Sequence, residues 1–330
     1  MTLDRRAFLG TSLGALATLG LGVSGAAHGQ THYPDKPVSL IVGAPPGGSN
    51  DIVARLLTQR LTAKLGGTFL VDNRPGASGA RAAEYVTRQP ADGYTLLMTN
   101  VGMEVLNPIL LPDSHYDPLR DSVPVAMIGT ITNILVVTPS LPVHSVAELI
   151  AYAKAHPGKL NFGSAGTGGS VHLAGELFKM RTGVSMTHVP YRGSGPMVTD
   201  LMAGVVQLAF DNFPSSIGAV KAGSLRALAV TSAKRWPLAP DLPTMQESGV
   251  PNFDISTWFG ISARSGTPPA IVKQLSQAIN EITQEPDFVK RLATIGAIPY
   301  SMDMAQFPAL LAKEHTRWKE IIDGAHVKIE

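Results

Sequence analysis

Two glycine-rich loops constrain the fold of this chain most, because each lies between a strand-like and a helix-like run. The first loop, residues 43–51 (GAPPGGSND), follows the apolar run 38–42. Apolar residues at helical spacing come after it, up to Leu65, and Gly66 is placed to stop the helix. This order of strand, tight turn and helix predicts a βα unit.

The second loop repeats the design more than a hundred residues later. Residues 163–170 (GSAGTGGS) follow the short apolar run 160–162 and precede a helix predicted over 170–181. Glycine lets such a loop turn sharply and approach a ligand closely, and the next helix directs free N–H groups toward it. We expect two anion-binding loops on separate lobes that close on one small anion. A Cβ at Gly48 or Gly168 is expected to obstruct that approach or to force a disfavoured φ.

Strand and helix patterns alternate through the rest of the chain, which predicts an α/β fold with mainly parallel sheets flanked by helices. Ser145 and Glu148 form a capping-box pattern at one helix start. We expect a first lobe made of residues 30–131 plus 255–330 and a second lobe of residues 132–254, with crossovers near 130–134 and 252–258. The expected strands include residues 38–42, 69–73, 94–99, 125–129, 134–138, 206–212, 226–231 and 258–262.

Residues 1–29 are predicted to be an export signal. Arg5 and Arg6 precede a mildly apolar, glycine-broken run over residues 10–27, a pattern typical of twin-arginine signals. Small residues before Gln30 favour cleavage between Gly29 and Gln30. The alternative is an N-terminal membrane anchor, for which the run is short.

Composition excludes several functions. The chain has no cysteine, so it has no disulfide, thiolate metal site, cysteine nucleophile or lipid-modified cysteine. Removing Arg5, Arg6 and Asp4 with the signal takes the formal net charge from +2 to +1, which gives no case for a nucleic-acid surface. No P-loop, zinc-protease or serine-hydrolase motif occurs in a suitable context, so we expect no catalytic residue, no metal and no cofactor.

Several motifs occur in order across the mature chain: YPDKP (33–37), PPGGSND (45–51), DNRPG (72–76), DGYTL (92–96), GSAG (163–166), HLAGE (172–176), VPY (189–191) and WFG (258–260). Together they resemble the Bug (tripartite tricarboxylate transporter) extracytoplasmic receptors. The resemblance implies a two-lobed periplasmic binding fold, type II-like, with two crossovers and a ligand cleft between the lobes. It also implies a monomer in the periplasm that binds a small organic carboxylate and delivers it to small and large membrane subunits.

The chain departs from the pattern of that family at two places. Gly43 and Ala44 stand where a branched or aromatic pair is common, and Met103 and Glu104 stand where small polar residues or His are common. Both places lie near the expected pocket and leave the identity of the ligand open. A sensor that docks on a signalling receptor remains an alternative function, and a periplasmic hydrolase is a further one.

The candidate ligand-binding residues come from both loops and from later strand ends. Several have a structural alternative: the serines and Thr167 can cap a helix, His172 can be a buried structural residue, and Tyr191 can fill a lobe wall. Asp211 and Asn212 can serve structural hydrogen bonds, and Arg192 can be solvated. Trp258 can be hinge core or pocket wall. The full set is Pro46, Gly47, Gly48, Ser49, Asn50, Thr99, Asn100, Ser164, Ala165, Gly166, Thr167, Gly168, Ser170, His172, Tyr191, Arg192, Gly193, Asp211 and Asn212.

Overall fold

The strands and helices follow the predicted alternation closely. The computed structural model describes residues 33–111 and 115–327, so the predicted export signal at residues 1–29 lies outside the described residues. The strands are β1 (Val38–Val42), β2 (Phe69–Asn73), β3 (Thr95–Asn100), β4 (Ser122–Val137), β5 (Leu160–Ser164), β6 (Met186–Pro190), β7 (Leu208–Asn212), β8 (Arg226–Val230), β9 (Ser256–Arg264) and β10 (Ile298–Pro299).

These strands form one mixed sheet in the order β2-β1-β3-β9-β4-β7-β5-β6, with β8 and β10 paired to β4. Strands β1, β2 and β3 run parallel to one another, as do β5, β6 and β7. All pairings of β4 and β9 are antiparallel. The expected parallel pairing therefore holds within the two three-strand groups, and two antiparallel strands join those groups.

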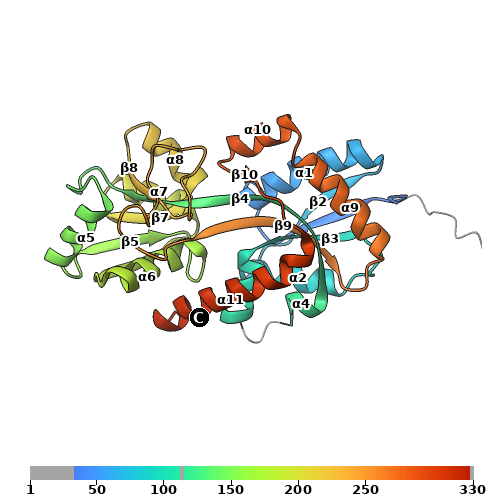
Figure 1. Cartoon of the computed structure of the whole chain (residues 1–330), viewed down its shortest axis with the longest axis horizontal. Helices are drawn as coiled ribbons and strands as arrows, with labels where there is room; N and C mark the ends of the chain where they lie inside the picture. Colours follow the sequence, from blue (N-terminus) through green and yellow to red (C-terminus); the bar gives the residue numbers. More distant parts are fainter. Residues whose placement is uncertain (1–32, 112–114, 328–330) are drawn as a thin grey trace, which may run out of the picture. The chain divides into compact units, whose positions relative to one another are not determined.

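Strand β4 is longer than the sequence predicted. We expected separate strands at 125–129 and 134–138, because Thr130, Thr132 and Asn133 interrupt the apolar pattern. The structure has one strand instead, since its first part pairs with β9 up to Thr132 and its last part pairs with β7 and β8 from Asn133 onward. Figure 1 shows β4 and β9 running side by side between the two groups of strands. The crossover predicted near 130–134 is therefore continuous strand.

Local sequence signals set the helix ends. Gly66 ends α1 (Ser49–Leu65) in the left-handed conformation, with a φ of 72°. Ser145 caps α5 (Val146–Ala155) through its Oγ, which accepts from Glu148 N, and the Glu148 carboxylate accepts from His144 N. The other helices are α2 (Ala80–Thr87), α3 (Asn107–Leu110), α4 (Pro118–Asp121), α6 (Ser170–Thr182), α7 (Ser194–Met202), α8 (Phe213–Lys221), α9 (Pro269–Ile282), α10 (Pro286–Thr294) and α11 (Phe307–Gly324). Short helical turns are η1 (Ala77–Gly79), η3 (Met304–Gln306) and the π-helical η2 (Gly102–Leu106).

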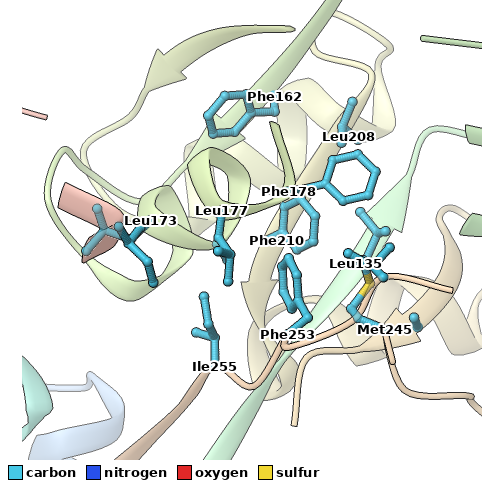
Figure 2. Close-up of a cluster of buried hydrophobic side chains, with 14 of the residues drawn as sticks. Leu135, Phe162, Leu173, Leu177, Phe178, Leu208, Phe210, Met245, Phe253 and Ile255 are labelled. Carbon is cyan, nitrogen blue, oxygen red and sulfur yellow. The ribbon is translucent and has the colours of Figure 1, made fainter. Parts of the chain in front are cut away.

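Apolar side chains between the sheet and its helices form the core. In Figure 2, Phe178 of α6 lies beside Phe210 of β7, and Phe253 packs on Phe210 with ring centroids 5.8 Å apart. All three rings are fully buried. The described residues 33–111 and 115–327 belong to one compact unit, and the predicted division into lobes 30–131 plus 255–330 and 132–254 stays a prediction.

Candidate functional site: a pocket at two helix N-termini

A pocket of about 250 Å³ lies where the two glycine-rich loops lead into their helices. The starts of α1 and α6 contribute to it, together with the ends of β3 and β7 and the crossover strands β4 and β9. Among the described residues that line it, none has a charged side chain. They are Ser49, Asn50, Asn100, Val101, Gly102, Leu106, Ile131, Gly169, Ser170, Asn212, Thr257 and Phe259.

The first helix enters this pocket without a side-chain cap. Gly48 is the N-cap residue of α1, and its φ of −76° and ψ of 165° are extended. The first intrahelical bond runs from Ile52 N to the Gly48 carbonyl, at 3.0 Å. The N–H groups of the preceding residues, Ser49 and Asn50 among them, therefore have no partner in the helix, and the positive end of the helix dipole lies beside the pocket.

The second helix begins in the same way. Gly169 is the N-cap residue of α6, with a φ of −78° and a ψ of 167°. The first intrahelical bond runs from Leu173 N to the Gly169 carbonyl, at 3.0 Å. Gly47 and Gly168, each directly before an N-cap glycine, have φ values of 84° and 80°. The sequence Gly-Gly-Ser therefore adopts one backbone conformation at both loops, and the positive φ at its first glycine favours that residue.

One part of the glycine expectation was wrong. Gly48 has an ordinary φ, and a Cβ built there would lie 3.6 Å from the Pro45 carbonyl oxygen, a normal contact. The constrained glycine of the first loop is Gly47. The reason is that the chain reverses at Gly47, one residue before the N-cap residue. Local sequence does not show which glycine of a Gly-Gly pair takes the positive φ.

Asp51 holds the first loop in place. Its carboxylate accepts from Gly47 N at 2.9 Å, Asn73 Nδ2 at 3.0 Å and Arg55 Nε at 3.0 Å. Burial acts to raise the pKa of Asp51, but the hydrogen bonds from these three residues outweigh burial and lower that pKa. Asp51 is therefore an ionised anchor of the loop, and it is not among the residues that line the pocket.

A stacked pair of imidazoles holds the second loop. His172 Nδ1 accepts from Gly168 N at 3.1 Å, and the ring stacks on that of His188 with centroids 3.7 Å apart. His188 Nε2 lies 2.7 Å from Ser164 Oγ, which also donates to the Gly166 carbonyl. His172 and Ser164 are buried, so both support the loop from within and do not line the pocket.

Asn100 connects the first loop to the end of β3. Its Nδ2 donates to Asn50 Oδ1 at 3.2 Å, and its Oδ1 accepts from Met103 N at 3.1 Å. Both Asn50 and Asn100 line the pocket, whereas Thr99 is buried beneath it. The predicted ligand edge at the end of β3 is therefore part of the pocket wall.

The remaining candidates do not line the pocket. Tyr191 Oη donates to Asp200, and Asp211 is fully buried and accepts from Ser194 and Ser216. Burial raises the pKa of Asp211. Of the nineteen candidate residues, Ser49, Asn50, Asn100, Ser170 and Asn212 line the pocket. Those that do not line it are Pro46, Gly47, Gly48, Thr99, Ser164, Ala165, Gly166, Thr167, Gly168, His172, Tyr191, Arg192, Gly193 and Asp211.

The sequence did not indicate the contribution of the crossover strands. Ile131 of β4 lines the pocket, as do Thr257 and Phe259 of β9. Trp258, between them, is buried and packs on Phe307 instead, because side chains alternate along a strand. The one signal in the sequence was the alternation of side chains around Trp258. To predict the lining residues from it, one must know which face of β9 meets the pocket.

The positions where the chain departs from the pattern of the family it resembles do not line this pocket. The Ala44 carbonyl accepts from Asn73, and the Met103 side chain is buried against Gly79. Glu104 lines a larger pocket of about 490 Å³, between residues 115–119 and α11, and bonds to Tyr116 Oη at 3.1 Å. We take the smaller pocket as the candidate site because both helix N-termini and the strand ends meet there.

Comparison with known proteins agrees with this fold. Residues 53–327 match the family model described as the tripartite tricarboxylate transporter family receptor. Protein BugT of Bordetella pertussis is 39% identical over 299 residues, which cover 90% of this chain and 92% of BugT.

Two solved structures extend the comparison. R. palustris Rpa4515 with adipate has a TM-score of 0.82 and 41% identity, covering 90% of this chain and 99% of that one. The periplasmic binding protein BugD has a TM-score of 0.77 and 30% identity, covering 90% of this chain and all of BugD. The fold is that of a solute-binding receptor. More particularly, the chain belongs to the TctC family of tripartite tricarboxylate transporter receptors, to which the Bug proteins are related.

Proposed function

We propose that this protein captures a small carboxylate in the pocket between α1 and α6, as a periplasmic receptor. The observation that carries the proposal is the pair of uncapped helix N-termini, Gly48–Ser49 and Gly169–Ser170, at one pocket. Each N-terminus offers free N–H donors and about half a positive charge to an anion.

The uncharged lining supports a carboxylate that is held by neutral groups. No Lys or Arg is among the described residues that line the pocket, so backbone amides and the Ser49, Asn50, Asn100 and Ser170 side chains are the available donors. The structure of Rpa4515, 41% identical to this chain, contains adipate. The proposed ligand is therefore an organic acid of similar size, bound through its carboxylate.

Mass spectrometry of small molecules released from the purified protein tests this proposal, followed by calorimetry with a panel of carboxylic acids. Each acid that binds is paired with its amide. We expect the amide to bind at least about tenfold more weakly, equivalent to about 1.4 kcal/mol, because it lacks the charge that the helix ends favour. Equal affinity for acid and amide contradicts the proposal.

We further propose that the ligand closes lobe 1 (residues 30–131 plus 255–330) on lobe 2 (132–254), since α1 and α6 belong to different predicted lobes. A ligand that contacts both helix ends favours the closed state by its differential affinity for that state. The chain segments near 130–134 and 252–258 are the proposed hinges. X-ray scattering is expected to show compaction with ligand, and an unchanged radius of gyration with saturating ligand argues against closure.

The proposed role places the receptor in the periplasm, where it delivers the acid to the small and large membrane subunits of a tripartite tricarboxylate transporter. Among residues 33–111 and 115–327, no helix is long and apolar enough to cross a membrane. Arg5 and Arg6, outside the described residues, are the proposed twin-arginine signal. Replacing both with Lys is expected to retain the protein in the cytoplasm, and an unchanged periplasmic yield excludes this route.

A further inference from the structure

Asn133, on the crossover strand β4, is a buried amide without a hydrogen-bonding partner. Its side chain is fully buried, and neither Nδ2 nor Oδ1 has a partner among the described residues. A buried polar group without a partner destabilises the folded state, so such groups are rare in folded proteins. The position of Asn133 relative to the pocket indicates what its amide can bind.

Asn133 is not itself among the lining residues, but strand geometry sets it next to two residues that are. Ile131, two residues earlier on β4, lines the pocket, and residues two apart on a strand share a face of the sheet. Asn133 is also directly opposite Asn212 in the antiparallel register of β4 and β7, so the two side chains lie on one face. Asn212 lines the pocket, and its own Oδ1 is buried without a partner. Two adjacent amides therefore have unused hydrogen-bonding atoms at one side of the pocket.

The backbone of Asn133 is held firmly, so its unused side chain does not reflect a loose strand. Asn133 N donates to Thr231 Oγ1 at 3.1 Å, and the Asn133 carbonyl accepts from Thr231 N at 2.9 Å. Thr132 Oγ1 donates to the same carbonyl at 3.0 Å. Because the strand is fixed on both sides, the Asn133 amide is positioned in advance for a bound group.

The available atoms select the chemistry of that group. They are one donor, Asn133 Nδ2, and two acceptors, the Oδ1 atoms of Asn133 and Asn212. A carboxylate can only accept hydrogen bonds. It satisfies Asn133 Nδ2, but its negative oxygens then face the two Oδ1 atoms, which also only accept. An ammonium can only donate, and no carboxylate among the described lining residues balances its charge. A hydroxyl group both donates and accepts, which fits this set.

We propose that Asn133 and Asn212 form a second subsite of the pocket, which hydrogen-bonds a hydroxyl group on the carboxylate ligand. This inference rests on the proposed function, because the helix N-termini hold the carboxylate of the same molecule. It makes Asn133 a specificity-determining residue, and it makes the ligand a hydroxy acid.

Calorimetry with two pairs of acids tests the subsite: succinate against malate, and adipate against 3-hydroxyadipate. For the pair that the wild-type protein binds, we expect at least about tenfold tighter binding of the hydroxy acid. Asn133→Leu, of similar size without the amide, is expected to bring this ratio close to one. The Leu variant is also expected to melt no lower than the wild-type protein without ligand, because it removes an unpartnered buried amide.

Ser262→Ala is the matched control. Ser262 Oγ on β9 is likewise buried without a partner, but Ser262 pairs with Leu97 of β3 and with Pro124, nine residues before Asn133 along β4. This variant is expected to keep the wild-type ratio. The inference is overturned if the wild-type protein binds neither pair or shows no preference for the hydroxy acid. It is also overturned if Asn133→Leu keeps the wild-type ratio, or if this variant melts at a lower temperature than the wild-type protein without ligand. Failure of every carboxylate in the broader panel overturns the proposed function as well, whereas equal binding within a pair overturns the subsite alone.

Discussion

Asp51 and His172 occupy the same position in two helices and make the same hydrogen bond. Each is the third residue of its helix, and each accepts from the backbone N–H of the glycine that precedes the N-cap residue. The distances are 2.9 Å from Gly47 N to Asp51 Oδ2 and 3.1 Å from Gly168 N to His172 Nδ1. A carboxylate and an imidazole thus fix two copies of one loop geometry, which leaves the amides at each helix start available for a ligand.

The first prediction concerns the glycines that this geometry constrains. Gly47→Ala and Gly168→Ala put a Cβ on a residue in the left-handed region, which costs about 1–2 kcal/mol. Gly48→Ala is the control, since its φ of −76° suits any residue. We expect the first two variants to weaken binding of the carboxylate about tenfold in calorimetry and Gly48→Ala to change it little. Equal effects of all three changes contradict the conformational explanation.

The second prediction concerns Asp51. Asp51→Ala leaves Gly47 N–H without its acceptor and leaves Asn73 Nδ2 with only its bond to the Ala44 carbonyl, so we expect a loss of about 1–3 kcal/mol in the free energy of unfolding. Arg55→Ala removes the exposed partner of the same carboxylate and is expected to cost less than about 1 kcal/mol. Denaturant titration measures both. A larger loss in Arg55→Ala than in Asp51→Ala is inconsistent with Asp51 as the loop anchor.

The third prediction concerns Glu104, where burial raises the pKa to about 8 despite the opposing hydrogen bond from Tyr116. Between about pH 4.5 and 8 the native state holds the Glu104 proton more firmly than the unfolded state does. The contribution of Glu104 to stability is therefore fully present below about pH 4.5. The contribution falls as the pH rises, by up to about 1.4 kcal/mol per pH unit. We expect Glu104→Gln to gain stability relative to wild type between pH 5 and 8 in parallel denaturation curves. A constant difference across that range shows that Glu104 does not titrate there.

The fourth prediction concerns His188, whose pKa is lowered to about 4 by burial and by the neighbouring His172; Glu176 raises that pKa and Lys179 lowers it. Here the unfolded state binds more protons between about pH 4 and 6.5. Native stability is therefore lost as the pH falls through this window. We expect His188→Asn, which cannot take up that proton, to gain on wild type as the pH falls from 6.5 to 4. Titration of the His188 ring by NMR measures the pKa directly, and an ordinary value near 6.5 refutes the prediction.

Local sequence determined the βα units and their loops. Gly47–Gly48 and Gly168–Gly169 permit a turn that few other residues adopt, and Gly66 and Ser145 end or begin helices through bonds to residues four or fewer positions away. Interactions of this range are contained within the motif itself, so the sequence alone predicts them. The sequence motifs were also sufficient to identify the family, because many of them occur in order along the chain.

Tertiary structure alone decided how these units combine. Strand β4 continues through Thr130–Asn133 because β9, β7 and β8, from about 70 to over 120 residues away in sequence, supply its hydrogen bonds. That pairing brings Ile131, Thr257 and Phe259 to the pocket and sets Asn133 beside Asn212. A strand's pattern shows that its side chains alternate, but only its partners fix which face meets the ligand.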